Sequence, residues 1–148
     1  MDCWVDGQPA DALSLKDRGL AYGDGLFETI AVRSGQPILL DRHLTRLADG
    51  CSRLAIAADI ELIRHELLSY AAAMGEGVLK LILTRGDGLR GYAPDPTASG
   101  RRILQGNPPA AYPAVHAEQG VRLFPCSTRL AKQPLLAGLK HLNRLEQV

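Results

Sequence analysis

A lysine near the end of the sequence has neighbours that could make its amine reactive. Lys140 follows Gly138, which loosens the backbone, and precedes a predicted helix start with Asn143 as its N-cap. Leu142 and Leu145 provide apolar anchors on either side of that start. An amine held among apolar groups has a lowered pKa and can attack a carbonyl carbon to form a Schiff base. Most lysines beside a helix are solvated charges, so the rest of the sequence must decide the role of this one.

Arg46 is a candidate ligand for an anion. Its planar, permanently charged guanidinium group suits the oxygens of a phosphate. On the predicted helix, however, Asp49 lies three positions further on, and a surface ion pair between the two is the commoner arrangement. The local sequence alone favours that ion pair.

The glycine-rich loop Arg85–Tyr92 is a second candidate for anion binding. Its glycines let backbone N–H groups approach an anion, Arg85 or Arg90 could clamp a carboxylate, and Tyr92 could stack on a ring. The alternative is a plain connection between two strands, and the residues leave both interpretations open. The loop does not match the nucleotide-binding pattern G-x-x-x-x-G-K-[ST].

Other chemistry finds little support in the spacing of the residues. Asp24 and Glu28 straddle a junction between a loop and a strand, so their separation does not define an acid–base pair. The cysteines and histidines lack the spacing of metal ligands, and we expect the histidines to be surface or hydrogen-bonded groups. These residues are Cys3, Cys51, Cys126, His43, His65, His116 and His141.

Composition limits the class of protein. The 148 residues are 46% hydrophobic and 22% charged, with a net charge of +1. These values are typical of a globular chain. The net charge is too small to create an electrostatic field that would attract nucleic acid or an anionic membrane. The N-terminus lacks the features of a signal peptide, and unpaired cysteines are typical of a reducing compartment. We therefore expect a cytoplasmic protein with no membrane or nucleic-acid partner.

The hydrophobic pattern predicts an α+β fold. The expected order is strands, two amphipathic helices and further strands. Asp17–Asp24 is interpreted as a loop and Asp41 as a helix N-cap. On the strand that follows the loop, Phe27, Thr29 and Ala31 are expected to face away from Leu26, Glu28, Ile30 and Val32. A short strand is expected within Cys3–Gln8, entering a turn at Asp6-Gly7, and a hairpin-type turn at Ser34–Pro37 leads into Ile38–Leu40. The longer predicted strands are Leu26–Val32, Val78–Thr84, Arg102–Gln105 and Val121–Phe124, and the helices run from Asp41 to about Ala55 and from Ile60 to Met74.

Prolines mark the expected domain boundary. Residues 1–106 are predicted to form an N-terminal α+β domain, 107–118 a linker, and 119–148 the beginning of a C-terminal domain. A helix that has only begun at Asn143–Gln147 suggests that these residues are the front part of a longer polypeptide.

Three motifs resemble the fold-type IV enzymes that depend on pyridoxal 5'-phosphate (PLP). They are D-R-G-L-A-Y-G-D-G-L-F-E-T at Asp17–Thr29, H-L-T-R-L at His43–Leu47 and K-H-L-N-R-L-E-Q at Lys140–Gln147. Their order spans nearly the whole chain. Within that group, the run Thr84–Tyr92 and the last motif are most similar to the aminodeoxychorismate lyase branch.

This resemblance implies a fold, a cofactor and a set of roles. The chain would be the small N-terminal domain of such an enzyme plus the start of its larger domain, with Lys140 as the catalytic Schiff-base lysine and Arg46 as the phosphate ligand of PLP. Thr29, Arg90, Tyr92 and Asn143 would lie near the substrate. The small-molecule substrate would be 4-amino-4-deoxychorismate, and the enzyme a homodimer. The family's carboxylate partner of the pyridine nitrogen would lie beyond these 148 residues.

Two other interpretations stay open. A branched-chain or D-amino-acid aminotransferase would use the same lysine and the same cofactor. A non-catalytic binding module formed by residues 1–106 would use neither. The Arg85–Tyr92 loop favours the lyase over the aminotransferase.

Overall fold

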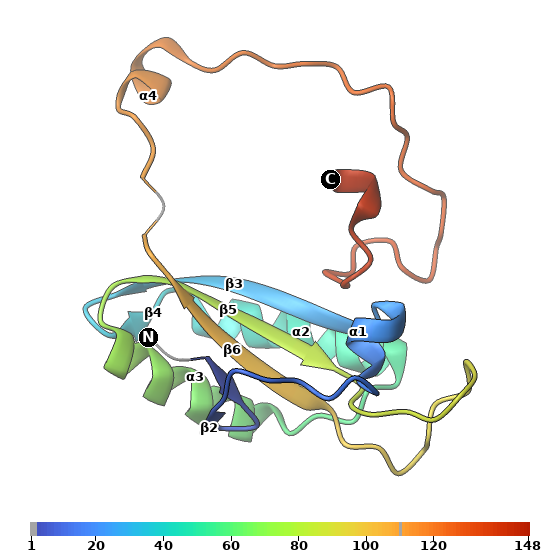
Figure 1. The fold of residues 1–148 in the computed structure, drawn as a ribbon. Helices are drawn as coiled ribbons and strands as arrows, with labels where there is room; N and C mark the ends of the chain where they lie inside the picture. The colour runs from blue at the N-terminus through green and yellow to red at the C-terminus, as the bar shows by residue number, and fades with distance from the viewer. Residues whose placement is uncertain (1–2, 110) are drawn as a thin grey trace.

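A six-stranded antiparallel sheet organises the protein. The computed structural model describes residues 3–109 and 111–148, and it confirms the expected α+β class. The strands lie in the order β2-β1-β6-β5-β3-β4 (Figure 1). Their bounds are β1 Trp4–Val5, β2 Gln8–Pro9, β3 Gly25–Arg33, β4 Gln36–Pro37, β5 Gly77–Thr84 and β6 Arg101–Asn107. The helices are α1 Arg18–Tyr22, α2 Leu40–Leu54, α3 Ile60–Met74, α4 Val115–Gln119 and the 3-10 helix η1 Leu145–Gln147.

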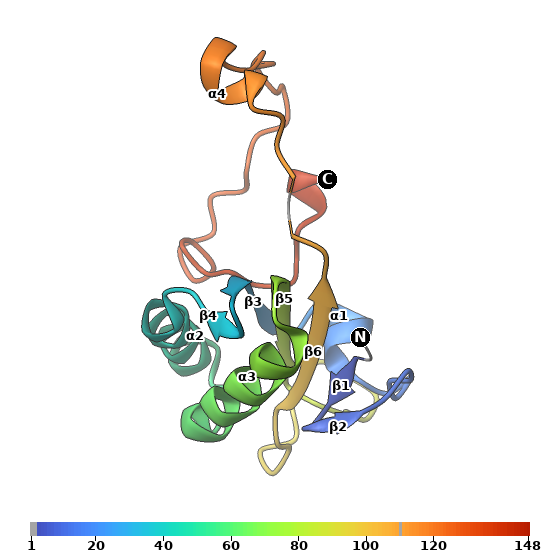
Figure 2. The ribbon, with the colours of Figure 1, turned by 90° about the vertical axis from the view of Figure 1, so that its left-hand side faces the viewer.

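The two long helices cover one face of the sheet and leave the other open (Figure 2). The predicted alternation along β3 is confirmed. Leu26, Ile30 and Val32 are buried against the helices, while Thr29 and Ala31 are exposed on the opposite face. Leucines of β5 and β6 complete the core on the helix side: Leu79, Leu81, Leu83 and Leu104. Each such side chain contributes about 1.5–3 kcal/mol on burial.

The starts of the two long helices differ in their capping. Asp59 caps α3 by accepting a hydrogen bond from the Leu62 amide at 3.0 Å. The N-cap predicted at Asp41 is wrong, because α2 begins after Leu39, whose backbone is left-handed and which provides no side-chain cap. Asp41 instead lies in the first turn and binds Arg64 at 2.7 Å.

A short helix replaces the loop predicted at Asp17–Asp24. The buried Asp17 carboxylate accepts hydrogen bonds from the amides of Gly19 and Leu20 at 2.8 and 3.3 Å, which starts α1. Gly23 then ends it with a left-handed backbone at φ 65°. A helix of five residues is too short to show a hydrophobic period, so the sequence pattern did not indicate it.

After β6 the chain leaves the sheet in a long arc and comes back to it (Figures 1 and 2). The strand predicted at Val121–Phe124 is wrong: no described strand pairs with it, and Leu123 and Phe124 are each 88% exposed. Asn143 is not the predicted N-cap either, since η1 begins after Arg144. The division into 1–106, 107–118 and 119–148 stays a prediction.

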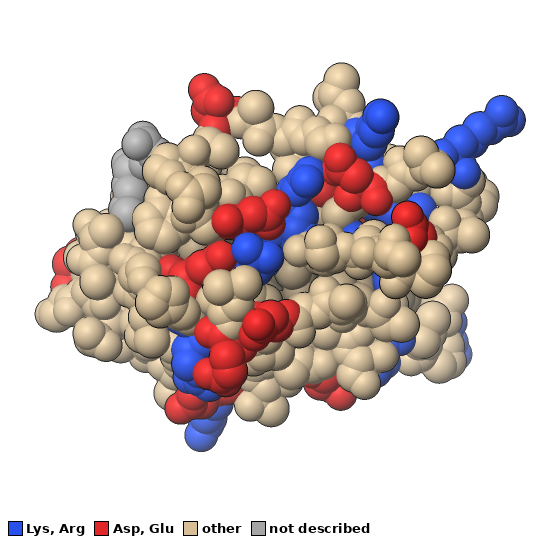
Figure 3. Space-filling model, turned by 90° about the horizontal axis from the view of Figure 1, so that it is seen from below, with Lys and Arg blue, Asp and Glu red and all other residues tan. Residues whose placement is uncertain are grey.

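The surface shows no dominant sign of charge. Acidic and basic side chains are interspersed on the face seen in Figure 3, as expected from the net charge of +1. None of the described helices is long and apolar enough to cross a membrane.

Candidate functional site

Lys140 is positioned by backbone pairing with the edge of β3. The Phe27 amide donates to the carbonyl oxygen of Lys140 at 2.9 Å, and the Leu142 amide donates to that of Gly25 at 3.0 Å. Leu139 is buried beside this contact, at 6% exposure. The pairing places the Lys140 amine over the Phe27 ring, with Nζ 4.1 Å from the ring centroid. The lysine is therefore fixed by the sheet and not by the helix start that the sequence suggested.

Two more cations surround the same ring. Nζ of Lys80, from β5, lies 5.7 Å from the Phe27 centroid, and Cζ of Arg144 lies 5.5 Å from it. Arg144 is held by the carbonyl oxygens of His141 and Leu139, each 2.9 Å from it. The open face of the sheet thus carries a cationic cluster, which we define as Lys80, Lys140 and Arg144 around Phe27.

This environment lowers the pKa of Lys140. Partial burial is the largest influence and lowers the pKa of Lys140, and the positive charges of Arg46, Arg144 and Lys80 lower it further. The Glu28 carboxylate raises this pKa but does not outweigh the rest. A lysine with a lowered pKa has more of its amine free to act as a nucleophile or base.

Arg46 joins the site through a buried carboxylate. Its Nε and Nη2 atoms both donate to Glu28, with Nε 2.7 Å from Oε1, and this contact raises the pKa of Arg46. His43 Nδ1 donates to the other oxygen of Glu28 at 2.7 Å. The ion pair expected between Arg46 and Asp49 is wrong, because the core-facing Glu28 attracts the guanidinium more strongly than an exposed aspartate does. Asp49 instead lies near Arg53, with 3.9 Å between Asp49 Oδ2 and Arg53 Nη1.

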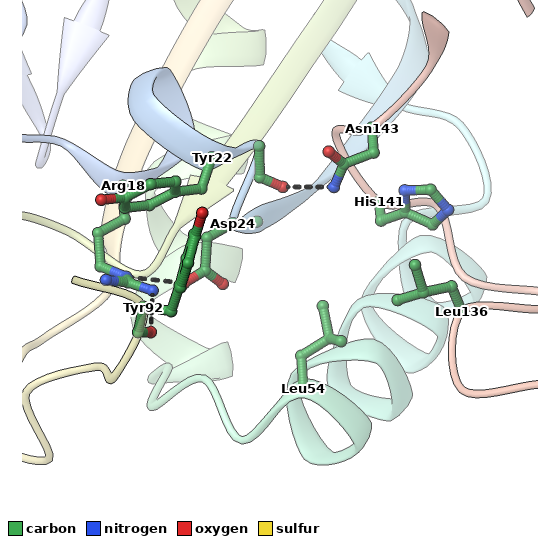
Figure 4. Close-up of a pocket in the computed structure, with 10 residues that line it drawn as sticks. Arg18, Tyr22, Asp24, Leu54, Tyr92, Leu136, His141 and Asn143 are labelled. Atoms are coloured by element: carbon green, nitrogen blue, oxygen red, sulfur yellow. Dashed lines mark hydrogen bonds and ion pairs between the residues drawn. The ribbon is translucent and has the colours of Figure 1, made fainter. Parts of the chain in front are cut away.

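A hollow opens beside α1, between Leu54 at the end of α2 and the returning residues Leu136, His141 and Asn143 (Figure 4). It has a volume of about 360 Å³. The Tyr22 and Tyr92 rings lie 5.6 Å apart within it, and Asn143 Nδ2 donates to the Gly23 carbonyl at 3.1 Å. The remaining named side chains in its wall are Arg18 and Asp24.

The Nδ1 atom of His141 departs from the surface or hydrogen-bonded position that the sequence predicted for the histidines. Its Nδ1 atom is buried and has no hydrogen-bond partner among residues 3–109 and 111–148. Burial lowers the pKa of His141, and the nearby charge of Arg144 acts in the same direction.

Asp24 connects the start of β3 to the Arg85–Tyr92 loop. Its carboxylate accepts hydrogen bonds from Arg18 Nε and Arg85 Nε, each at 2.8 Å. Burial alone would raise the pKa of Asp24, but the hydrogen bonds from Arg85 and Arg18 lower it below its ordinary value. Arg85 also donates to the carbonyls of Leu54 and Ala55. Its guanidinium is thus occupied within the protein, and Arg85 is not the carboxylate clamp that the sequence allowed.

The structure separates the predicted site residues into two groups. The charge of Arg46 acts on Lys140 and lowers its pKa, and Thr29 is exposed on the face that carries Phe27. Tyr92 and Asn143 instead line the hollow beside α1. Arg90 is exposed in its loop.

Sequence reasoning missed four residues of the site. Phe27, Lys80 and Arg144 were not singled out, because a neighbour across the sheet or on a returning segment leaves no trace in local spacing. Glu28 was considered only as the partner of Asp24. Its place on the core-facing side of β3 was the available signal, since a buried carboxylate requires a partner.

Comparisons with known proteins agree on one family. Residues 25–148 match the sequence profile of the family described as amino-transferase class IV. The chain is 36% identical to an aminodeoxychorismate lyase from Vibrio harveyi over 98% of its own length and 54% of the relative. It is 69% identical, with a TM-score of 0.96, to the crystal structure of 4-amino-4-deoxychorismate lyase from Pseudomonas aeruginosa, over 98% of this chain and 54% of that one.

A more distant structure carries the cofactor. The PLP-bound form of a hypothetical aminotransferase from Mycobacterium tuberculosis is 26% identical, with a TM-score of 0.57, over 67% of this chain and 34% of that one. The chain spans about half the length of the curated relative named above.

Proposed function

Because the chain belongs to the class IV aminotransferase family, we propose that it is part of a PLP-dependent lyase that converts 4-amino-4-deoxychorismate to 4-aminobenzoate and pyruvate. The observation that carries the proposal is the Lys140 amine, held 4.1 Å from the Phe27 centroid by backbone pairing with β3. The likeness to the Pseudomonas lyase, 69% identical over 98% of the chain, supports this choice within the family.

The residues present suit PLP. Lys140 offers an amine whose pKa is lowered by burial, as covalent attachment to a carbonyl carbon requires. The side chain of Arg46 is 50% exposed even though Glu28 binds one of its edges, so its other edge is accessible to a phosphate. Lys140 would therefore hold the cofactor covalently, and Arg46 would bind its phosphate. When bound, PLP supplies an electron sink for the substrate carbon that loses its proton.

In the proposed reaction the protein's own groups position the substrate and move a proton. Lys140 would take the proton from the carbon that carries the substrate's amine. As that proton is lost, the carbon–oxygen bond to the enolpyruvyl group breaks and the ring becomes aromatic. The departing enolpyruvate takes up a proton to give pyruvate. The charges of Lys80 and Arg144 beside Phe27 suit a substrate that carries carboxylates.

The remaining substrate contacts stay proposals. Thr29 lies on the sheet face that carries the Phe27 ring, where a hydroxyl group could meet the substrate. Tyr92 and Asn143 line the hollow beside α1, and Arg90 lies in the loop next to it. We assign these three to the substrate on the strength of their motif positions alone.

We also propose that the enzyme is a cytoplasmic homodimer. The three cysteines are free, which is typical of a reducing compartment. Light scattering coupled to size exclusion tests the oligomeric state, and a monomer at assay concentration would contradict it.

The activity is tested with the full-length polypeptide expressed from the gene. Incubation with 4-amino-4-deoxychorismate should give 4-aminobenzoate and pyruvate in equal amounts, and Lys140→Ala should abolish turnover. Substantial turnover by that variant would contradict the role of Lys140. Borohydride treatment followed by peptide mapping should locate PLP on Lys140, whereas a protein without any PLP absorbance would favour a non-catalytic binding module.

An aminotransferase is the second candidate, because the PLP-bound Mycobacterium tuberculosis protein is named as one. It would transfer the amino group to a keto acid and release no 4-aminobenzoate. Incubating the enzyme with branched-chain or D-amino acids and 2-oxoglutarate distinguishes the two activities.

A further inference from the structure

We propose that Glu28 is a positioning residue that orients Arg46 toward the phosphate of the cofactor. It holds the Nε–Nη2 edge of the guanidinium from the protein side and leaves the Nη1 edge for the ligand. This inference rests on the proposed function, because it takes PLP to be the ligand of Arg46.

The geometry around Glu28 is that of a fixed anchor. Its side chain is only 2% exposed, and both carboxylate oxygens are used. Oε1 accepts from Arg46 Nε at 2.7 Å, while Oε2 accepts from Arg46 Nη2 and, at 2.7 Å, from His43 Nδ1. His43 and Arg46 lie one turn apart on α2, so a single carboxylate of the sheet ties down two side chains of the helix.

An anchor of this kind changes what Arg46 can do. A long side chain that is half exposed on a helix ordinarily samples many rotamers and loses that freedom when it binds a ligand. The two-pronged contact with a buried carboxylate removes most of that freedom in advance. The guanidinium presents its remaining N–H groups in one fixed plane, which suits the oxygens of a phosphate.

Glu28 also balances charge at the site. Its carboxylate is close enough to act on Lys140, and its effect is opposite to that of Arg46. Without it, the uncompensated charge of Arg46 would join those of Lys80 and Arg144 near the amine. Loss of Glu28 therefore has two separable effects, one on the phosphate contact and one on the amine.

The matched pair PLP and pyridoxal separates these effects, because pyridoxal has the same aldehyde and lacks the phosphate. The apo form of the full-length polypeptide is titrated with each ligand, and the absorbance of the covalent Lys140 adduct gives two dissociation constants. In Glu28→Gln we expect PLP to bind roughly tenfold more weakly, since a charged hydrogen bond is weakened. Pyridoxal lacks the phosphate contact and reports only the effect on the amine, so it should not bind more weakly, and the ratio of the two constants isolates the phosphate contact.

Glu66→Gln is the matched control. Glu66 is also buried and holds Arg102 with two hydrogen bonds, at 2.9 and 3.0 Å, between α3 and β6. Glu66→Gln should remove a similar ion pair from the fold. It should leave the ratio of the dissociation constants for PLP and pyridoxal unchanged. A change in that ratio for Glu66→Gln would show that general destabilisation, and not the orientation of Arg46, explains the effect.

Glu28→Asp provides the rescue and the safeguard against misfolding. It keeps the charge on a shorter side chain. The ratio of its dissociation constants for PLP and pyridoxal should therefore lie between the ratios of the wild type and Glu28→Gln. An unchanged ratio in Glu28→Gln, or in Glu28→Asp if the glutamine variant does not fold, would overturn the proposal. If the wild-type protein binds no PLP, the proposed function fails instead, and the two failures are thereby distinguished.

Discussion

The backbone amide of Phe27 donates a hydrogen bond to the carbonyl oxygen of Lys140 at 2.9 Å, and the side chains of the same two residues meet above the sheet with Nζ 4.1 Å from the ring centroid. One residue of β3 therefore sets both the backbone position and the environment of the lysine. The arrangement depends on rigid sheet structure and not on the loop from which the lysine comes. Sites supported by strands keep their geometry better than sites held by loops alone.

The basicity of Lys140 should depend on Lys80. Because the charge of Lys80 is one of those that lower the pKa of Lys140, Lys80→Met should move this pKa up toward its ordinary value of 10.5. Competitive labelling of the amines with acetic anhydride across a range of pH, followed by mass spectrometry of the Lys140 peptide, measures it. Lys132→Met, which removes an exposed lysine of the long arc, is the control. An equal pKa in the wild type and Lys80→Met would contradict the electrostatic explanation.

Asp24 should be important for stability. Asp24→Asn leaves Arg18 and Arg85 without their common anion, and breaking such a largely buried pair costs about 3 kcal/mol. Urea denaturation measures the loss. Asp41→Asn, which disrupts the exposed pair with Arg64, should cost much less. Similar losses for the two variants would contradict this prediction.

The same aspartate should contribute to acid sensitivity. Its pKa is lower in the folded protein than in the unfolded chain, so its stabilisation is present above its ordinary pKa and is lost as pH falls through the lowered one. Unfolding free energies measured in acid should therefore decline less steeply with falling pH in Asp24→Asn than in the wild type. Parallel curves would contradict the assignment.

Gly19 should resist replacement although it lies in a helix. A Cβ atom there would lie 2.3 Å from Cγ2 of Thr84, so Gly19→Ala should destabilise the protein by about 1–3 kcal/mol. Thr84→Ser removes that methyl group and keeps the hydroxyl that donates to Asp17 at 2.7 Å. In a double-mutant cycle the serine should recover part of the loss, and strict additivity would show that the steric explanation is wrong.

Cys51 should be inert toward thiol reagents. Burial raises its pKa to about 11, so little thiolate forms near neutral pH. Cys126 is exposed and provides the internal comparison. With iodoacetamide at pH 8, peptide mass spectrometry should find Cys126 modified well before Cys51. Equal rates in the native protein would contradict the burial of Cys51.

Much of the fold follows from local pattern. The helix predicted from Ile60 to Met74 has those bounds in the structure, because Asp59 and Gly75 are residue types that favour the two ends of a helix. The two faces of β3 were also predicted, since alternation is a local property. The sequence-based prediction is wrong where a contact between distant parts of the chain decides the structure, or where the element is very short. The carboxylate of Asp17 starts a helix too brief to show a period, and Val121–Phe124 has the composition of a strand without a partner strand to pair with.

The site divides in the same way. The motifs that resemble fold-type IV enzymes indicate Lys140 and Arg46. In the structure, the charge of Arg46 lowers the pKa of Lys140. Local reasoning paired Arg46 with Asp49 because they are neighbours on a helix. It could not foresee Glu28, which comes from a strand on another part of the chain. The roles of Thr29, Arg90, Tyr92 and Asn143 remain predictions.

The pairing of residues 139–142 with the edge of β3 has a consequence for the order of folding. Antiparallel β3 and β5 form from the first 84 residues, whereas Phe27 and Lys140 meet only when a loop containing most of the chain has closed. The entropic cost of closure grows with loop length, and contacts distant in sequence form slowly. We therefore expect the sheet to assemble before the amine reaches the Phe27 ring.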